Sequence, residues 1–120
     1  MSKVIVFTTE SASGLQSTMD LRFGRAKAFV LVDMESGEVI NEIENNSRDA
    51  AHGAGIATAA MIASQKVSGV VSGRFGPKAY EALSKLNVPM WTLKEECTVS
   101  EALSQLKNGH LEQQKVEVFT

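Results

Sequence analysis

Two short segments of the chain place arginine beside glycine, and both contain the same tripeptide. Residues 21–26 read LRFGRA and residues 73–79 read GRFGPKA, so Arg-Phe-Gly occurs twice in 120 residues. Each segment adds a second cation, which is Arg25 in the first and Lys78 in the second. Guanidinium groups form charge-assisted hydrogen bonds to anions, and glycine lets the backbone approach a ligand closely. These segments therefore predict anion binding.

A histidine and a cysteine add two candidate metal ligands. His52 precedes Gly53 and Gly55 in the run AHGAG, and Cys97 is the only cysteine of the chain. Imidazole and thiolate are common ligands of transition metals. A single thiol cannot supply the ligand set of a four-cysteine zinc or iron–sulfur site, so no such site is predicted.

The hydrophobic pattern predicts the elements that must position these residues. Apolar and β-branched runs predict strands over residues 3–9, 28–34, 38–44, 67–73 and 88–93. Amphipathic runs predict helices over residues 56–66, 77–87 and 98–109. The third helix opens on a capping box, Thr98-x-x-Glu101. The polar, Gly- and Ser-containing composition of residues 10–20 predicts a flexible surface loop. A small edge strand or an ordered tail is predicted over residues 115–119.

The order of these elements predicts one α/β domain over residues 1–120, built on a mixed five-stranded sheet. Short links make the first three strands antiparallel, and right-handed crossovers add the later strands in parallel. Four loops and three helix N-termini then meet at the carboxyl edge of the first strand, where α/β sheets usually bind ligands. The binding residues predicted at this edge are Arg22, Phe23, Gly24, Arg25, His52, Gly53, Gly55, Gly73, Arg74, Phe75 and Gly76. We expect the arginines of the two segments to form opposite walls of one site.

Each of these residues also has a purely structural explanation. Glycines before helices commonly form turns, and arginines of the first segment can pair with Asp20 or Asp33. The two phenylalanines can fill the core beneath the loops. The cysteine can be a small buried hydrophobe, and the histidine can be a residue of a helix start without a ligand. The functional interpretation depends on the convergence of all of them at one edge.

Composition and charge exclude several classes of partner. Hydrophobic residues make up 43% and charged residues 22%, with a formal net charge of −2, as in ordinary soluble domains. This charge gives no general reason to bind nucleic acid or an anionic membrane. One cysteine cannot form an intramolecular disulfide, and no signal peptide or run of about 18 apolar residues is present. We expect a cytoplasmic protein.

Sequence motifs of several enzyme classes are absent. The chain lacks G-x-x-x-x-G-K-[ST] and C-x-x-C, and residues 53–58, GAGIAT, lack the third glycine of a dinucleotide-binding fingerprint. No group of residues suggests acid–base chemistry. Binding is therefore favoured over catalysis, and we expect a protein that is not an enzyme.

Four stretches in a fixed order resemble the dinitrogenase iron–molybdenum cofactor biosynthesis family. They are DLRFGRAKAFVLVD (20–33), AHGAGIATAAMI (51–62), VVSGRFGPKAYEAL (70–83) and TVSEALSQLKNGHL (98–111). The resemblance covers nearly the whole chain. It implies a ribonuclease-H-like three-layer α/β/α fold, with strand order 3-2-1-4-5 and the second strand antiparallel.

The resemblance also implies binding of a molybdenum-containing metal–sulfur cluster, of a mixed molybdenum–copper sulfide or an iron–molybdenum precursor type. Such clusters are anions with sulfide surfaces, so arginine and backbone N–H groups can hold them non-covalently. His52 would then donate to sulfide or, less favourably, coordinate a metal. The family implies a protein complex that donates or receives the cluster. Two alternatives are a regulatory or protein-interaction domain that binds a small anion at the same edge, and, from fold analogy alone, a metal-dependent nuclease.

Overall fold

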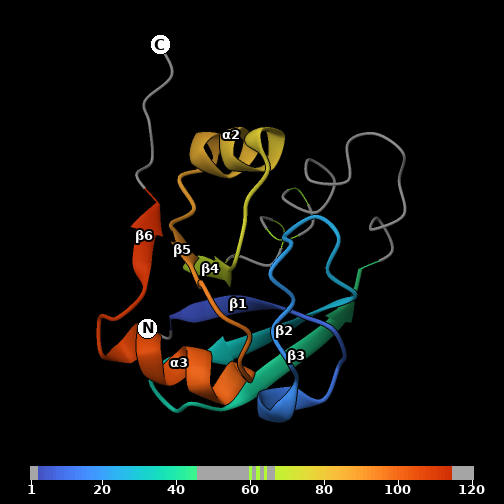
Figure 1. Cartoon of the computed structure of the whole chain (residues 1–120), viewed down its shortest axis with the longest axis vertical. Helices are drawn as coiled ribbons and strands as arrows, with labels where there is room; N and C mark the ends of the chain where they lie inside the picture. Colours follow the sequence, from blue (N-terminus) through green and yellow to red (C-terminus); the bar gives the residue numbers. More distant parts are fainter. Residues whose placement is uncertain (1–2, 46–59, 61, 63, 65–66, 115–120) are drawn as a thin grey trace.

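A six-stranded mixed sheet, in the order β3-β2-β1-β4-β5-β6, lies at the centre of the protein. The computed structural model describes residues 3–45, 60, 62, 64 and 67–114 (Figure 1). The strands are β1 Val4–Thr9, β2 Ala28–Asp33, β3 Val39–Glu44, β4 Gly69–Ser72, β5 Met90–Thr92 and β6 Glu112–Gln114. The helices are α2 Pro77–Lys85, α3 Val99–Lys107 and the short 3-10 helix η1 Gly14–Gln16.

The strand directions confirm the predicted topology and add one strand to it. β2 is antiparallel to β1 and β3, whereas β4 is parallel to β1 and β5. The additional strand, β6, pairs antiparallel with β5 at the edge of the sheet. Its sequence, EQQ, has no apolar alternation, so the hydrophobic pattern could not reveal it. The edge strand or tail predicted over residues 115–119 lies outside the described residues.

The sheet is covered on both faces, which confirms the three-layer architecture. Alternate residues of β1 enter different cores, because Val6 packs on the α2 side and Phe7 on the α3 side. Leu83 of α2 and Leu103 of α3 close these two cores. Figure 1 shows α2 and α3 on opposite sides of the sheet. Because β1 is covered twice, its residues from Ile5 to Thr9 are all buried, as expected for a central strand.

The two helices described in full begin in different ways. The predicted capping box of α3 is present: Thr98 Oγ1 accepts from the Glu101 N–H, and Glu101 Oε1 accepts from the Thr98 N–H. α2 instead begins with Pro77 after Gly76, and no side chain caps it. Of the helix predicted over residues 56–66, Ala60 and Ile62 are described as helical. No helix in the described part of the chain is long and apolar enough to cross a membrane.

Residues 10–20 are predicted to form a flexible surface loop, but the end of this segment is buried. Ser17, Met19 and Asp20 are buried. Their backbone is tied to the rest of the fold, since Asp20 N donates to Thr8 O and Met19 N donates to Cys97 O, both over 2.8 Å. Met19 enters the α3-side core, which explains why this segment is fixed. We call residues 17–23 the crossing segment.

Candidate functional site

The crossing segment runs over the carboxyl edge of the sheet from one face to the other. On the α3 side, Thr18 forms an antiparallel bridge with Thr98. On the α2 side, Arg22 forms a parallel bridge with Arg74, and Phe23 N donates to Arg74 O over 3.0 Å. The two Arg-Phe-Gly tripeptides therefore lie side by side and run in the same direction. They form one continuous wall, whereas the sequence had suggested opposite walls.

Close packing beneath the two tripeptides holds them together. The rings of Phe23 and Phe75 have centroids 5.2 Å apart, and Phe23 is buried in the α2-side core. Gly73 is needed for this approach, because a Cβ atom there would lie 2.4 Å from Leu21 Cβ and 2.8 Å from Leu21 Cα. Phe75 thus supports the wall by packing beneath it, as its structural explanation predicted, whereas Gly73 supports it by a close approach to Leu21 and not by forming a turn.

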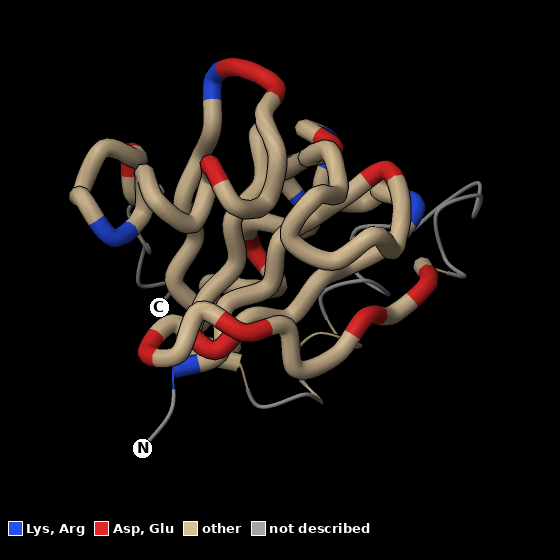
Figure 2. The backbone as a smooth tube through the Cα atoms, turned by 90° about the horizontal axis from the view of Figure 1, so that it is seen from below, with Lys and Arg blue, Asp and Glu red and all other residues tan. Residues whose placement is uncertain are grey.

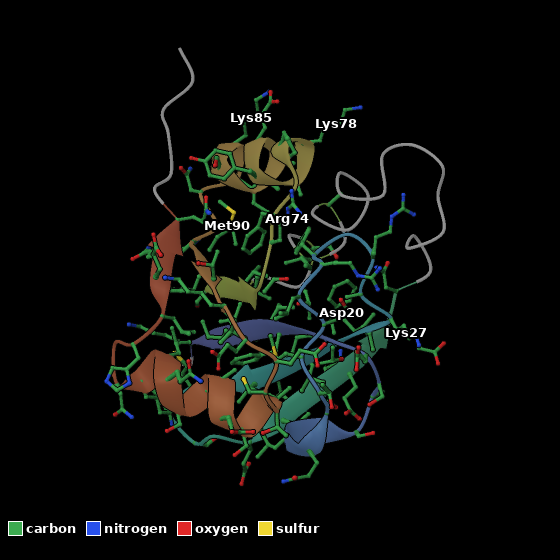
Figure 3. The ribbon with its side chains drawn as sticks, viewed as in Figure 1. Asp20, Lys27, Arg74, Lys78, Lys85 and Met90 are labelled. Carbon is green, nitrogen blue, oxygen red and sulfur yellow. The ribbon has the colours of Figure 1, made fainter. Side chains whose placement is uncertain are left out.

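A pocket of about 290 Å³, here called the basic pocket, opens beside this wall on the α2 side of the sheet. Its described lining is Arg22, Phe23, Gly24, Arg25, Arg74, Gly76, Lys78 and Ala79. Six of these residues belong to the predicted binding set. The four cations are exposed, and no acidic residue is among the described lining. Figure 3 shows Arg74 on the α2 side of the sheet and Lys78 projecting from α2.

The charges around the basic pocket are incompletely balanced within the described part of the chain. Arg22 Nε lies 3.4 Å from Asp20 Oδ1, whereas Arg74 and Lys78 form no ion pair with a described carboxylate. Arg22 and Arg74 are directly paired in an isolated bridge, and like charges brought close together repel each other. An anion bound between the paired arginines would relieve this repulsion.

The N-terminus of α2 adds a partial positive charge to the basic pocket. Gly76, Lys78 and Ala79 line the basic pocket at the uncapped N-terminus of the helix, where N–H groups lack intrahelical acceptors. The N-terminus of α3 differs, because the Glu101 carboxylate of the same helix caps it by accepting from the Thr98 N–H. Of these two predicted helix N-termini, α2's therefore opens on the basic pocket and α3's is capped. His52, Gly53 and Gly55 lie outside the described residues, and their roles stay predictions.

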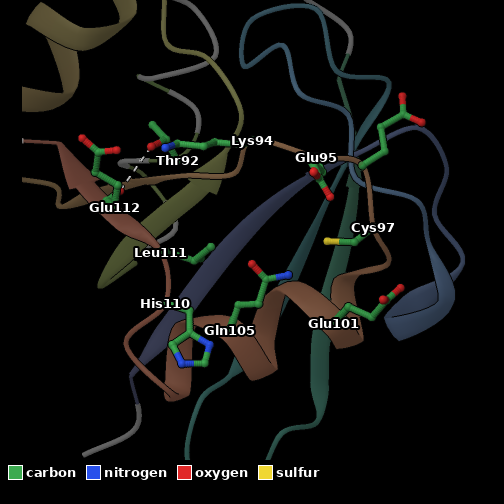
Figure 4. Close-up of a pocket in the computed structure, with 10 residues that line it drawn as sticks. Thr92, Lys94, Glu95, Cys97, Glu101, Gln105, His110, Leu111 and Glu112 are labelled. Carbon is green, nitrogen blue, oxygen red and sulfur yellow. Dashed lines mark hydrogen bonds between the residues drawn. The ribbon is translucent and has the colours of Figure 1, made fainter.

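Cys97 is separated from the arginines by the sheet. It lines a second pocket of about 490 Å³ on the α3 side, here called the acidic pocket. The lining residues are Thr92, Lys94, Glu95, Glu96, Cys97, Glu101, Gln105, His110, Leu111 and Glu112 (Figure 4). Seen from this side in Figure 2, acidic positions are spread along the backbone and basic ones are few. The predicted metal ligand thus lies in a negative environment.

The environment of Cys97 favours the thiol over the thiolate. Burial raises the pKa of the Cys97 thiol above its ordinary value, and the Glu101 carboxylate raises this pKa further. Since the thiolate is the form that binds metals, coordination by Cys97 is disfavoured. Among the residues that the structure describes, no group of three or more histidine, cysteine, aspartate or glutamate side chains is arranged to hold a metal ion.

The raised pKa of Cys97 can be measured by alkylation with iodoacetamide. A Glu101→Gln variant keeps a capping-box residue but removes the negative charge, so the pKa should fall and alkylation should be faster at the same pH. Glu112→Gln removes a charge from the same pocket without being a cause of the shift, and should react like the wild type. Equal rates for all three proteins would contradict this electrostatic account.

Comparison with known proteins places this arrangement in context. A family model described as dinitrogenase iron-molybdenum cofactor matches residues 1–109. An uncharacterized protein of Methanocaldococcus jannaschii is 33% identical over 92 residues, which are 75% of this chain and 77% of that protein.

Two solved structures are also similar. One is the apo form of the orange protein from Desulfovibrio gigas, with a TM-score of 0.87, 31% identity and coverage of 95% of this chain and 94% of that one. The other is an NMR structure of a Thermotoga protein, with a TM-score of 0.79, 30% identity and coverage of 100% and 97%. Both similarities extend over nearly the full length of the chains compared.

Proposed function

Because the chain belongs to the dinitrogenase iron-molybdenum cofactor family, we propose that it binds and carries an anionic molybdenum-containing metal–sulfur cluster without catalysing a reaction. The observation that supports this most directly is the basic pocket. Arg22 and Arg74, the two paired arginines, bring like charges together on one wall, with Arg25 and Lys78 beside them. Such a concentration of cations on a chain of net charge −2 indicates an anionic ligand.

The donor set of the basic pocket fits a cluster that keeps its own sulfide ligands. Its described lining offers guanidinium, ammonium and backbone N–H groups, and no thiol, imidazole or carboxylate. These groups can donate to sulfide without replacing it, so the cluster would be held non-covalently. The cluster would be a molybdenum–copper sulfide or an iron–molybdenum cofactor precursor. In this proposal His52 also donates to the cluster, because a lone imidazole ligand would bind a metal only weakly.

The proposed carrier works in the reducing cytoplasm, as its single cysteine suggests, and exchanges the cluster with a protein complex. A second candidate function rests on the same donors, which also suit phosphate and carboxylate. In that case the chain would be a regulatory or interaction domain for a small organic or phosphate anion. The two candidates differ in the ligand that the basic pocket retains.

Anaerobic reconstitution tests the proposal. Wild-type protein incubated with tetrathiomolybdate and copper, or with an iron–molybdenum precursor, should develop charge-transfer absorption that survives desalting. The Arg22→Ala, Arg25→Ala, Arg74→Ala triple variant should bind at least about a thousandfold more weakly, because three charge-assisted hydrogen bonds are removed. A Lys85→Ala, Lys94→Ala, Lys107→Ala variant has the same net charge as this triple variant and should bind like the wild type.

Two results would count against the proposal. Equal retention by the two triple variants would show that the cluster binds elsewhere. No uptake of any cluster by the wild type, together with thermal stabilisation by a phosphorylated metabolite, would favour the second candidate function.

A further inference from the structure

A buried carboxylate lies beside Arg22, one of the cations that line the basic pocket. The side chain of Asp20 is 4% exposed, although it lies in a connection between strands. Its Oδ1 accepts from the Arg22 N–H over 3.0 Å and lies 3.4 Å from Arg22 Nε. Arg22, in turn, lines the pocket. The carboxylate is therefore hydrogen-bonded to the guanidinium of a residue that lines the basic pocket.

The second oxygen of this carboxylate lacks a partner among the described residues. Asp20 Oδ2 is buried and forms no hydrogen bond within the described structure. The residue is also fixed through its backbone, because its carbonyl oxygen accepts from Thr8 Oγ1 over 2.6 Å and its N–H donates to Thr8 O. Burying a charge costs folding free energy, and the described residues give the second oxygen no partner in return, so a purely structural role does not account for this charge.

The turn formed by Asp20 does not require a negative charge. The bond from the Arg22 N–H to Oδ1 closes an Asx-turn, for which the neutral oxygen of asparagine serves equally well. What the charge adds is an electrostatic effect on the pocket. Water screens a buried charge poorly, so the carboxylate weakens the attraction of the cationic wall for any anion bound to it.

We propose that Asp20 sets the affinity of the basic pocket. Its Oδ1 positions Arg22, and its negative charge opposes the bound anion, so that a carrier with several cations can still release its ligand. This inference rests on the proposed function, because it concerns an anion that binds at the same pocket and must leave it. Asp20 is a positioning residue that acts through Arg22.

Neutralising Asp20 while keeping its shape tests this proposal. In anaerobic titrations with tetrathiomolybdate, Asp20→Asn should bind roughly tenfold more tightly than the wild type at low salt, and its affinity should fall more steeply as salt is added. Asp33→Asn is a matched control. Asp33 Oδ1 closes the same kind of turn with Glu35 N, but Asp33 pairs with Val4 at the opposite edge of the sheet. This control should bind like the wild type.

The direction of the change distinguishes the proposal from a merely structural role. Unchanged or weaker binding by a folded Asp20→Asn variant would overturn it, because loss of a structural contact cannot tighten binding. Asp20→Ser, whose hydroxyl can also form the turn, replaces the asparagine variant if that one does not fold.

A second probe separates this proposal from the proposed function. If the wild type does not bind tetrathiomolybdate, the cluster proposal fails, and the same variants are compared with inorganic phosphate. Tighter phosphate binding by Asp20→Asn would support the role of Asp20 independently of the cluster. If the wild type binds neither anion, both proposals are overturned.

Discussion

Replacing Gly73 by alanine is expected to separate the two Arg-Phe-Gly tripeptides and to abolish anion binding. The new Cβ would lie 2.4 Å from Leu21 Cβ and 2.8 Å from Leu21 Cα, and the second of these is a backbone atom. The crossing segment must therefore move away from β4. This movement breaks the hydrogen bond from the Phe23 N–H to Arg74 O and the bridge between Arg22 and Arg74. Overpacking of this kind destabilises a protein by about 1–3 kcal/mol.

Denaturant unfolding and tetrathiomolybdate titration together measure this effect, and Gly76, which itself lines the basic pocket, provides the control for stability. A Cβ atom at Gly76 would meet nothing within 4 Å, and its φ of −67° and ψ of 163° are open to any residue. Gly76→Ala should therefore change the free energy of unfolding by less than about 1 kcal/mol. The methyl group of the new alanine occupies open space at the N-terminus of α2. Wild-type stability and binding in Gly73→Ala would show that the crossing segment tolerates a methyl group here.

The fold was predictable because its signals are local and repeated. β1 begins with the apolar run VIVF, α3 carries a complete capping box, and the handedness of crossovers fixed the parallel strands. The same rules placed Arg22 and Arg74 at one edge of the sheet. That their tripeptides pair side by side depends on Gly73 and on the register of the crossing segment, neither of which has a sequence signature.

The position of Cys97 shows what topology alone could not provide. The end of a strand fixes the edge of the sheet at which the following loop lies, but that loop can settle over either face. Cys97 packs on the α3 face together with Met19, whose N–H donates to the Cys97 carbonyl, while the arginines lie on the α2 face. The role of Asp20 was hidden for a similar reason. The sequence offered Asp20 as a partner of an arginine, but not as a buried one.

Phe23 joins the hydrophobic core to the binding wall, so its truncation is expected to have a large effect on both. The side chain is 1% exposed and packs in the α2-side core with Phe29 and Leu83. Phe23→Ala should lower the free energy of unfolding by about 3–5 kcal/mol, since it creates a cavity in this core. Because the backbone N–H of the same residue bonds to Arg74 O, anion binding should also weaken. Denaturant unfolding gives the first quantity and titration with tetrathiomolybdate the second.

The aromatic partner of Phe23 provides a comparison at the same contact. Phe75 is only partly buried, although its ring lies 5.2 Å from that of Phe23. Phe75→Ala should therefore destabilise the protein less than Phe23→Ala, because it removes less buried apolar surface. Phe23→Leu fills most of the cavity and should recover much of the lost stability, and with it the binding. Equal destabilisation by Phe75→Ala and Phe23→Ala would contradict this account. It would show that the contact between the two rings, and not the burial of Phe23 in the core, holds the two tripeptides together.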